Sequence, residues 1–383
     1  MLICIHMLKN FAPTNLNRDD SNTPKTCVFG GVQRGRISSQ CLKRSWRTSS
    51  VFEEEVGGNL LGKRTRKLPE LVADYLRENK INEDFIKSAS RKLTGFGNKE
   101  RKENKDGDFT AQMILYSPSD IAAIGEMLIE LIHKCSDIKE FEKLTAKELQ
   151  ASLKESSSRP ITLDIALLGR MVTSDAFADV EASMQVAHAI STNKITMETD
   201  FFVAMDDLIS GSGNDDLGAG MMGDIDYNSN CYYIYASLDL EELRANLKNT
   251  PDSEKIVRAA IPALLNAMAF SNPSGKQNSF AGHSLPCAVC VECKDRKIPV
   301  SYANAFVKPV SADKNGDLVF NSIQKLADEV DSIKNDFGDL SRERFWFCKS
   351  GYDVKPDCVD KRSAGFPELI GDVTKCCFEQ AEV

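Results

Sequence analysis

A long helical block lies between two segments in which strands and helices alternate, and this order restricts the fold more than any other feature of the chain. Amphipathic helical patterns dominate from about residue 69 to residue 188, most clearly at 69–80, 119–135, 145–155 and 181–192. Before the block, residues 2–8 are apolar on both faces, which predicts a central strand. After it, strands are predicted at 231–236, 285–293 and 300–307, and helices at 239–248 and 252–270. The order predicts an α+β core that carries a large helical insertion.

Two segments read as long loops. Residues 195–231 leave the predicted sheet, with Phe201 and Phe202 before a run rich in Gly, Asp and Asn at 211–226. Loops of this length inside compact domains are usually functional or disordered. Residues 95–108 are charged and contain glycine, which is typical of a solvated surface loop; contact of its basic residues with nucleic acid is the alternative.

Composition excludes several classes of protein. No stretch reaches the roughly 18 consecutive apolar residues of a membrane span, and residues 1–8 are too short for a signal peptide, so we expect a cytoplasmic protein with no membrane partner. The 12 cysteines are scattered through the chain, which favours reduced thiols. The net charge of −8 argues against a nucleic-acid partner, but residues 25–47 contain six basic residues and no acidic one. These are Lys25, Arg34, Arg36, Lys43, Arg44 and Arg47.

The end of this basic segment has the pattern of an amphipathic helix. Ser38 or Ser39 can serve as its N-cap, and free backbone N–H groups at such an end favour an anion. Leu42 and Trp46 fall on one side and predict an anchor to the core. The opposite stripe, about 100° wide, consists of Gln40, Lys43, Arg44 and Arg47. Such a stripe can bind phosphates, or it can be a solvated basic face; composition leaves both readings open.

Seven sequence blocks carry a resemblance to a known family. They are LNRDD (16–20), FGG (29–31), RISSQCLKRSWR (36–47), DIALLGRMVTS (164–174), SMQVAHAIST (183–192), DFFVAMDDL (200–208) and SYANAFVK (301–308). In this order they resemble the CasC family, the repeated backbone subunits of type I-E CRISPR Cascade complexes. The resemblance spans nearly the whole chain and is weakest at about 50–160 and after 310.

The resemblance implies a modified RRM/ferredoxin-like palm, a large helical insertion called the fingers, and a long loop or hairpin called the thumb. The implied boundaries are 1–57 for the first part of the palm, 58–183 for the fingers, 184–194 for the palm again and 195–231 for the thumb. Residues 232–383 would form the second part of the palm and a C-terminal tail.

The resemblance also implies a function without catalysis or cofactors. Copies of the subunit would assemble helically along the crRNA, bind its phosphate backbone and splay nucleotides at regular intervals, so that the guide pairs with target DNA in antiviral defence. The implied partners are crRNA, target DNA through the guide, other copies of the chain and other Cascade subunits. The alternative is a metal-dependent ribonuclease of the type III backbone-subunit kind, for which Asp19, Asp20, Asp206 and Asp207 are candidate metal ligands.

Carried over by position, the RNA contacts fall into several groups. Phosphate contacts are implied for Lys25, Ser38, Gln40, Lys43, Arg44 and Arg47. The neighbouring Arg34 and Arg36 of the same basic segment are also predicted to contact the RNA. Arg170 would contact RNA and Met171 would pack on a nucleobase, Phe201 and Phe202 would pack against splayed bases, and Lys276 and Gln277 would contact the backbone. Arg18 and Asp20 would order the loop near the RNA or join neighbouring subunits. Without the resemblance, Met171 and the two phenylalanines would be assigned to the core, and Lys276-Gln277 to a plain turn.

Three further patterns are discounted. Cys287, Cys290 and Cys293, with His283 upstream, have spacings found in zinc sites, but strand alternation would point Cys290 and Cys293 to opposite faces, so buried thiols are expected. Gly218, Gly220 and Gly223 match a dinucleotide-binding motif that lacks the strand before it and the helix after it. His188 is expected to be packed within the predicted helix at 181–192.

Overall fold

The computed structural model describes residues 1–97, 108–154, 159–172, 176–204, 221–314 and 316–378. The chain divides into two compact units. The first unit comprises residues 1–52, 186–237 and 261–383, and the second comprises residues 53–185 and 238–260. Both strands and helices are abundant, so the predicted α+β class is confirmed.

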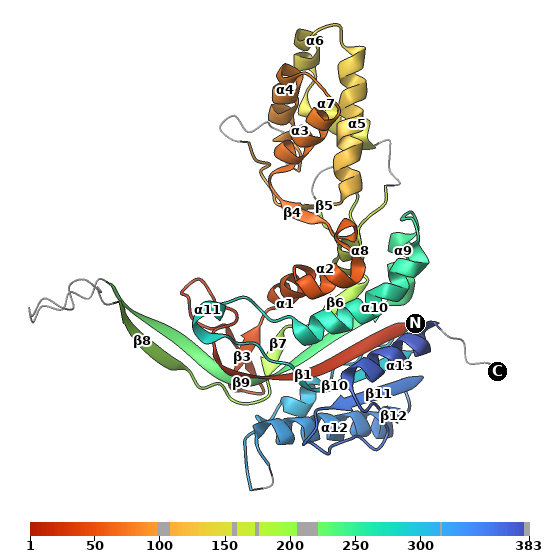
Figure 1. Ribbon diagram of the computed structural model, residues 1–383. Helices are drawn as coiled ribbons and strands as arrows, with labels where there is room; N and C mark the ends of the chain where they lie inside the picture. Colours follow the sequence, from red (N-terminus) through yellow and green to blue (C-terminus); the bar gives the residue numbers. More distant parts are fainter. Residues whose placement is uncertain (98–107, 155–158, 173–175, 205–220, 315, 379–383) are drawn as a thin grey trace, which may run out of the picture. The chain divides into compact units, whose positions relative to one another are not determined.

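A large mixed sheet organises the first unit (Figure 1). The described part of the chain contributes ten strands, in the order β12-β11-β10-β1-β9-β7-β3-β2, while β6 and β8 also pair with β9. Their bounds are β1 Leu2–Thr14, β2 Thr26–Phe29, β3 Val32–Ile37, β6 Met184–Val186, β7 Ala189–Ser191, β8 Glu198–Ala204, β9 Met221–Asp239, β10 Pro286–Lys294, β11 Glu343–Cys348 and β12 Lys361–Arg362.

Strand β1 is central in this sheet, as its apolar sequence predicts. Every side chain from Leu2 to Lys9 is buried, and β1 lies between β10 and β9. It pairs antiparallel with β10, in a register that places Leu2 opposite Lys294 and Leu8 opposite Ala288. A strand that is buried on both faces has no polar alternation, which explains the continuous apolar run.

Helix α12 (Leu318–Phe337) and the short 3-10 helix η2 (Tyr302–Phe306) supply apolar side chains to the core of the first unit. The cluster joins Leu326 and Val330 of α12 and Phe306 of η2 with Cys290 and Trp346 of the sheet. The other helices of this unit are α1 (Ser39–Arg47), α11 (Gln277–Phe280) and α13 (Phe366–Phe378).

The strand predicted at 300–307 is wrong, because η2 occupies this segment. Ser301 caps the turn by accepting a hydrogen bond from the N–H of Ala303 at 3.4 Å. Tyr302 and Phe306 are both buried, and their spacing of four residues fits a helical turn rather than strand alternation.

The helix predicted at 181–192 is also wrong, because strands β6 and β7 lie there. Ala189 and Ser191 are buried while His188 is exposed, so burial alternates with a period of two. Residue Ile190 pairs with Arg36 on one side and with Tyr233 on the other. Pairing with two distant strands has overridden the local helical pattern of this segment.

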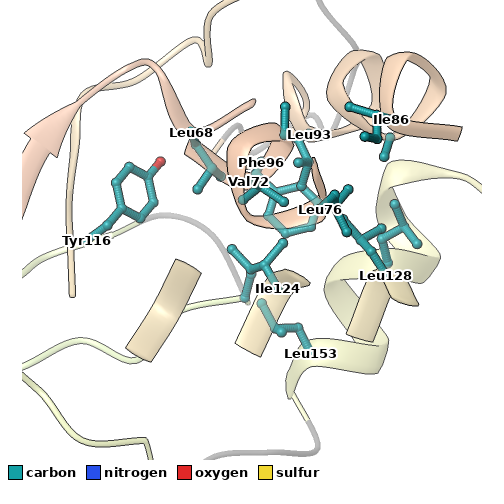
Figure 2. Packing of buried hydrophobic residues seen from close by; sticks show 14 of the residues in the cluster. Leu68, Val72, Leu76, Ile86, Leu93, Phe96, Tyr116, Ile124, Leu128 and Leu153 are labelled. Carbon is teal, nitrogen blue, oxygen red and sulfur yellow. The ribbon is translucent and has the colours of Figure 1, made fainter. Parts of the chain in front are cut away.

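The second unit is mainly helical and has its own apolar core. Figure 2 shows this core, in which Val72 and Leu76 of α3 pack with Leu93 and Phe96, and with Ile124 and Leu128 of α5. The N-terminus of α5 carries the capping box of Ser117 and Asp120. The unit contains η1 (Gly58–Leu60), β4 (Lys63–Thr65), α3 (Leu68–Glu78), α4 (Glu83–Leu93), β5 (Ile114–Tyr116), α5 (Pro118–Lys134), α6 (Ile138–Lys143), α7 (Ala146–Lys154), α8 (Leu163–Leu168) and α9 (Leu240–Leu247).

Helices α2 (Ser50–Val56) and α10 (Ser253–Phe270) each have residues in both units. The helices predicted at 69–80, 119–135, 145–155, 239–248 and 252–270 are confirmed within a few residues at each end. None of the helices in the described ranges is both long enough and apolar enough to cross a membrane.

Candidate nucleic-acid interface

Helix α1 begins where the sequence predicts. Ser38 is its N-cap, and the Ser38 hydroxyl accepts a hydrogen bond from the N–H of Cys41 at 3.3 Å. The side chain of Asn17 accepts a hydrogen bond from the N–H of Ser38 at 2.8 Å, which ties the preceding loop to the helix start. Leu42 and Trp46 are buried, as expected for the side that anchors the helix.

The opposite side of α1 carries the predicted polar stripe. Gln40 and Arg44 are exposed, whereas Lys43 and Arg47 are half-buried. Partial burial lowers the pKa of Lys43 from its ordinary value. The first turn of α1 contains no acidic residue, and Arg44 and Arg47 lie in its last turn. The helix therefore presents cations on one side and anchors itself with apolar groups on the other.

A cavity of about 440 Å³ lies next to this stripe, within the first unit. Its walls come from the loop after β1, from α1 and from the turn at Ser274-Gly275. The residues that line it are Leu16, Asn17, Arg18, Asp19, Asp20, Asn22, Cys41, Arg44, Ser274 and Gly275. Two cations, Arg18 and Arg44, and two carboxylates, Asp19 and Asp20, line this concave surface.

The loop between residues 15 and 24 is held by its own hydrogen bonds. An oxygen of the Asp19 carboxylate accepts from the N–H groups of Ser21 and Thr23 at 3.0 and 3.1 Å, and Arg18 donates to the side chain of Asn22. At Gly275, a Cβ atom would lie 2.3 Å from the carbonyl oxygen of Leu16. Only glycine allows the two segments to approach so closely.

Arg36 and Lys25 lie near the start of α1. The Nε atom of Arg36 donates to the carbonyl of Thr26 at 3.2 Å, and its Nη1 atom lies 3.3 Å from Nδ1 of His188. The backbone N–H of Arg36 donates to the carbonyl of Lys25 at 2.9 Å. His188 is exposed and lies between β6 and β7, so the predicted packed position in a helix is wrong.

Arg34 has a different role from the predicted RNA contact. Its side chain is fully buried, and its guanidinium donates hydrogen bonds to the carbonyls of Ser191, Thr192, Phe306 and Val307. The ring of Phe29 lies over the guanidinium at 5.8 Å. The residue joins β3 to β7 and η2, which corrects the prediction, because an arginine buried in this way cannot reach a phosphate.

Arg170 and Met171 are neighbours in the second unit, but they differ in burial. Arg170 is buried, and its Nη1 lies 2.7 Å from the carboxylate of Asp120, so the predicted RNA contact is corrected to a buried ion pair. Arg159 approaches the same carboxylate at 3.4 Å. In contrast, Met171 is 93% exposed, which excludes its alternative assignment to the core of this unit.

Strands β8 and β9 form a two-stranded antiparallel ribbon where the thumb was predicted (Figure 1). Phe201 faces Asp224 and is 65% exposed. Phe202 faces Gly223, and its ring occupies the space that a Cβ at position 223 would need, at 2.7 Å. The two phenylalanines therefore lie on opposite faces of the ribbon. Residues 205–220, which include Asp206, Asp207, Gly218 and Gly220, lie outside the described residues.

Lys276 and Gln277 lie in a turn, which is the assignment that the sequence favours without the family resemblance. The side chain of Gln277 donates to the carbonyls of Pro273 and Gly282 at 2.7 and 3.3 Å. Lys276 precedes the short helix α11 in a left-handed conformation, with φ of 50°. Both side chains are half-buried.

The zinc candidates lie in or near strand β10. Cys287, Cys290 and Cys293 are all buried in this strand, whereas His283 is exposed before it. Cys287 contacts the carbonyl oxygen of Leu8 through its thiol at 3.2 Å, and the sulfur of Cys293 lies 4.0 Å from that of Cys377. Within the described ranges, no three His, Cys, Asp or Glu side chains come together in a way that could hold a metal ion.

Comparison with known proteins identifies the family. No curated protein matches the chain. A solved structure described as "CRISPR RNA-guided surveillance complex, pre-nicking" contains a chain that is 26% identical, with a TM-score of 0.82, and the match covers 99% of this chain and 100% of that one. Another, described as "CRISPR RNA-guided surveillance complex", matches at 22% identity with a TM-score of 0.70, over 98% of this chain and 100% of that one, and at this identity it shows the fold alone. The model of the CT1975-like protein family matches residues 3–370. The finer resemblance to CasC subunits of type I-E complexes stays a prediction. Because the family model covers nearly the whole sequence, this chain belongs to the CT1975-like protein family.

Proposed function

We propose that this protein is a non-catalytic subunit of a CRISPR RNA-guided surveillance complex, and that it binds the phosphate backbone of the guide RNA. The observation that carries the proposal is the cationic stripe of α1, a helix that contains no acidic residue. The structural likeness to a chain of a surveillance complex supports the same conclusion.

The proposed binding is largely independent of sequence. Contacts from Lys43, Arg44 and Arg47 to phosphates would fix the position and register of the RNA without reading its bases. Base pairing between the guide and the target would then supply the sequence specificity, as in other RNA-guided systems. The net charge of −8 does not oppose this, because charges beyond roughly 10 Å are screened at working salt.

Repetition would supply the affinity. A single copy makes few phosphate contacts, so its binding should be modest and strongly dependent on salt. Several copies bound to one RNA would combine their contacts, so the assembly would hold the RNA with high avidity. In the proposed assembly the copies line up along the guide, and the β8–β9 ribbon of each copy contacts bases that are splayed from the RNA.

Charge reversal on α1 tests the proposal. We expect Lys43→Glu combined with Arg47→Glu to abolish association with guide RNA while the fold persists. The matched control is Lys87→Glu combined with Lys139→Glu, which makes the same change in net charge at exposed positions of α4 and α6. The measurement is the RNA content of the complex purified from cells that express the other subunits. Unchanged RNA content in the α1 variant would overturn the proposal.

The absence of catalysis is a separate part of the proposal. Incubation of the protein, guide and complementary RNA with Mg²⁺ or Mn²⁺ should leave the RNA intact. Cleavage at regular spacing that disappears on Asp19→Ala or Asp20→Ala substitution would instead favour a metal-dependent ribonuclease.

A further inference from the structure

His188 occupies an exposed position beside the start of α1. It lies between the end of β6 at Val186 and the beginning of β7 at Ala189. The pairing of Ile37 with Ala189 brings this break next to the end of β3, from which the chain enters α1. An exposed histidine here does not fill the core.

The Nδ1 atom of His188 faces two donors. It lies 3.2 Å from the backbone nitrogen of Ser39, the first residue of α1, and 3.3 Å from Nη1 of Arg36. The N–H groups in the first turn of a helix have no partner within the helix. Since both neighbours are N–H donors, Nδ1 must accept, which assigns the neutral tautomer with the proton on Nε2.

The surrounding charges favour the same neutral form. Partial burial lowers the pKa of His188, and the positive charges of Arg36 and Lys25 lower it further. A protonated ring would turn Nδ1 into a donor and would place a third cation at the positive end of the helix dipole. The neutral ring therefore acts as a fixed acceptor at this corner.

Arg36 is held at two of its three guanidinium nitrogens. Its Nε donates to the carbonyl of Thr26 and its Nη1 to His188. Among the described residues, Nη2 has no hydrogen-bond partner. A guanidinium that is already oriented loses less side-chain freedom when an anion binds to its remaining donors.

We propose that His188 is a positioning residue of the RNA interface. Through Nδ1 it holds the Arg36 guanidinium and the first N–H of α1, so that Nη2 of Arg36 and the stripe of α1 meet the phosphates together. This inference rests on the proposed function, because it takes the ligand of the basic surface to be single-stranded RNA.

Substitutions at His188 distinguish the roles of its two ring nitrogens. His188→Asn keeps an acceptor, because its side-chain oxygen can take the place of Nδ1, whereas His188→Gln reaches the place of Nε2 and loses that acceptor. The purified full-length chain is titrated into a fluorescently labelled, repeat-derived single-stranded RNA, and anisotropy gives Kd. We expect His188→Ala and His188→Gln to weaken binding on the order of threefold to tenfold. His188→Asn should stay within about twofold of wild type, and thermal unfolding identifies any variant that is not folded.

A double-mutant cycle with Arg36 makes the test specific. If His188 acts in part through Arg36, then His188→Ala should weaken binding less when Arg36→Ala is already present than it does in the wild-type protein. Independent effects that multiply in the double variant, or an Asn variant as weak as the Ala variant, would overturn the inference. Wild-type affinity in His188→Ala would overturn it as well. Failure of the proposed function gives a different result, since the wild-type protein itself would then not bind the RNA.

Discussion

The Nη2 atom of Arg34 lies 2.7 Å from the carbonyl oxygen of Phe306, although 272 residues separate the two in sequence. The same atom donates to the carbonyl of Val307 at 3.0 Å, and a Cβ at Gly30 would lie 2.1 Å from that carbonyl oxygen. Gly30 also has a positive φ of 60°, which a side chain would strain. The sequence blocks FGG and SYANAFVK thus meet, and Arg34 joins them.

Arg34 should contribute to stability rather than to RNA binding. Arg34→Gln leaves four carbonyl oxygens short of their charged donor, so we expect the free energy of unfolding to fall by about 2 kcal/mol or more. The matched control is Arg44→Gln, at an exposed position of α1, where a change within about 0.5 kcal/mol is expected. Denaturant unfolding measures both.

RNA affinity should be affected in the opposite way: Arg44→Gln should lower it more than Arg34→Gln does. Arg44→Gln should weaken binding and reduce the dependence of Kd on salt by about one phosphate contact. Arg34→Gln, at a temperature where it is folded, should bind as the wild type does. A stable Arg34→Gln that has lost RNA binding would restore the assignment of Arg34 as an RNA contact.

Arg170 and Met171 form a second matched pair in the helical unit. Removal of one partner of a buried ion pair leaves an uncompensated charge, so Arg170→Met should cost about 3 kcal/mol in unfolding free energy. Met171 is 93% exposed, so Met171→Ala should leave stability unchanged and should weaken RNA binding if the side chain packs on a base. Denaturant unfolding and RNA titration of both variants test the division. Equal stability losses in the two variants would contradict it.

The helix at the centre of the site could be predicted because its determinants are local. The cap at Ser38, the apolar pair Leu42 and Trp46, and the stripe that includes Arg44 all lie within ten residues, at spacings that a helix fixes. The central position of β1 could be predicted for the same reason, since burial on both faces leaves a continuous apolar run.

The roles of individual arginines could not be predicted in this way. Arg34 and Arg36 are two residues apart in one basic segment, yet one is fully buried and the other is half-exposed. The difference depends on the carbonyls of Ser191 and Phe306, which lie 157 and 272 residues away. The helical prediction for 181–192 fails for the same reason, since this segment forms strands by pairing with distant segments. Long-range contacts decide these cases, and local patterns do not contain them.

The two phenylalanines of the ribbon should differ in their effects. Phe201→Ala removes an exposed ring, so we expect RNA affinity to fall by about 1–3 kcal/mol while the ribbon persists. Phe202→Ala removes the ring that covers Gly223, so its main effect should be faster amide hydrogen exchange in β8 and β9. Hydrogen exchange and RNA titration distinguish the two. The assignment fails if Phe201→Ala binds RNA as tightly as the wild type.

Lys9 predicts a specific dependence of stability on pH. Its side-chain nitrogen Nζ is buried in β1 and donates to the carbonyl of Ser271 at 3.3 Å and to the side chain of Asn272 at 3.1 Å. Burial lowers the pKa of Lys9 from 10.5 to about 7. Between these two values the unfolded chain holds more protons than the folded protein, so the free energy of unfolding should rise with pH, by at most about 1.4 kcal/mol per pH unit.

The substitution Lys9→Met isolates this contribution, because it removes the amine and keeps a chain of similar length. The free energy of unfolding of the wild type, minus that of the variant, should increase steadily between about pH 7 and pH 9. Below about pH 7 the lysine is protonated in both states, so the difference should become constant. Lys87→Met, at an exposed position of α4, should show no such trend. If the difference in unfolding free energy between wild type and Lys9→Met stays flat across the whole range, Lys9 remains charged in the folded protein. In that case its two oxygen acceptors are enough to offset the cost of burying the ammonium group.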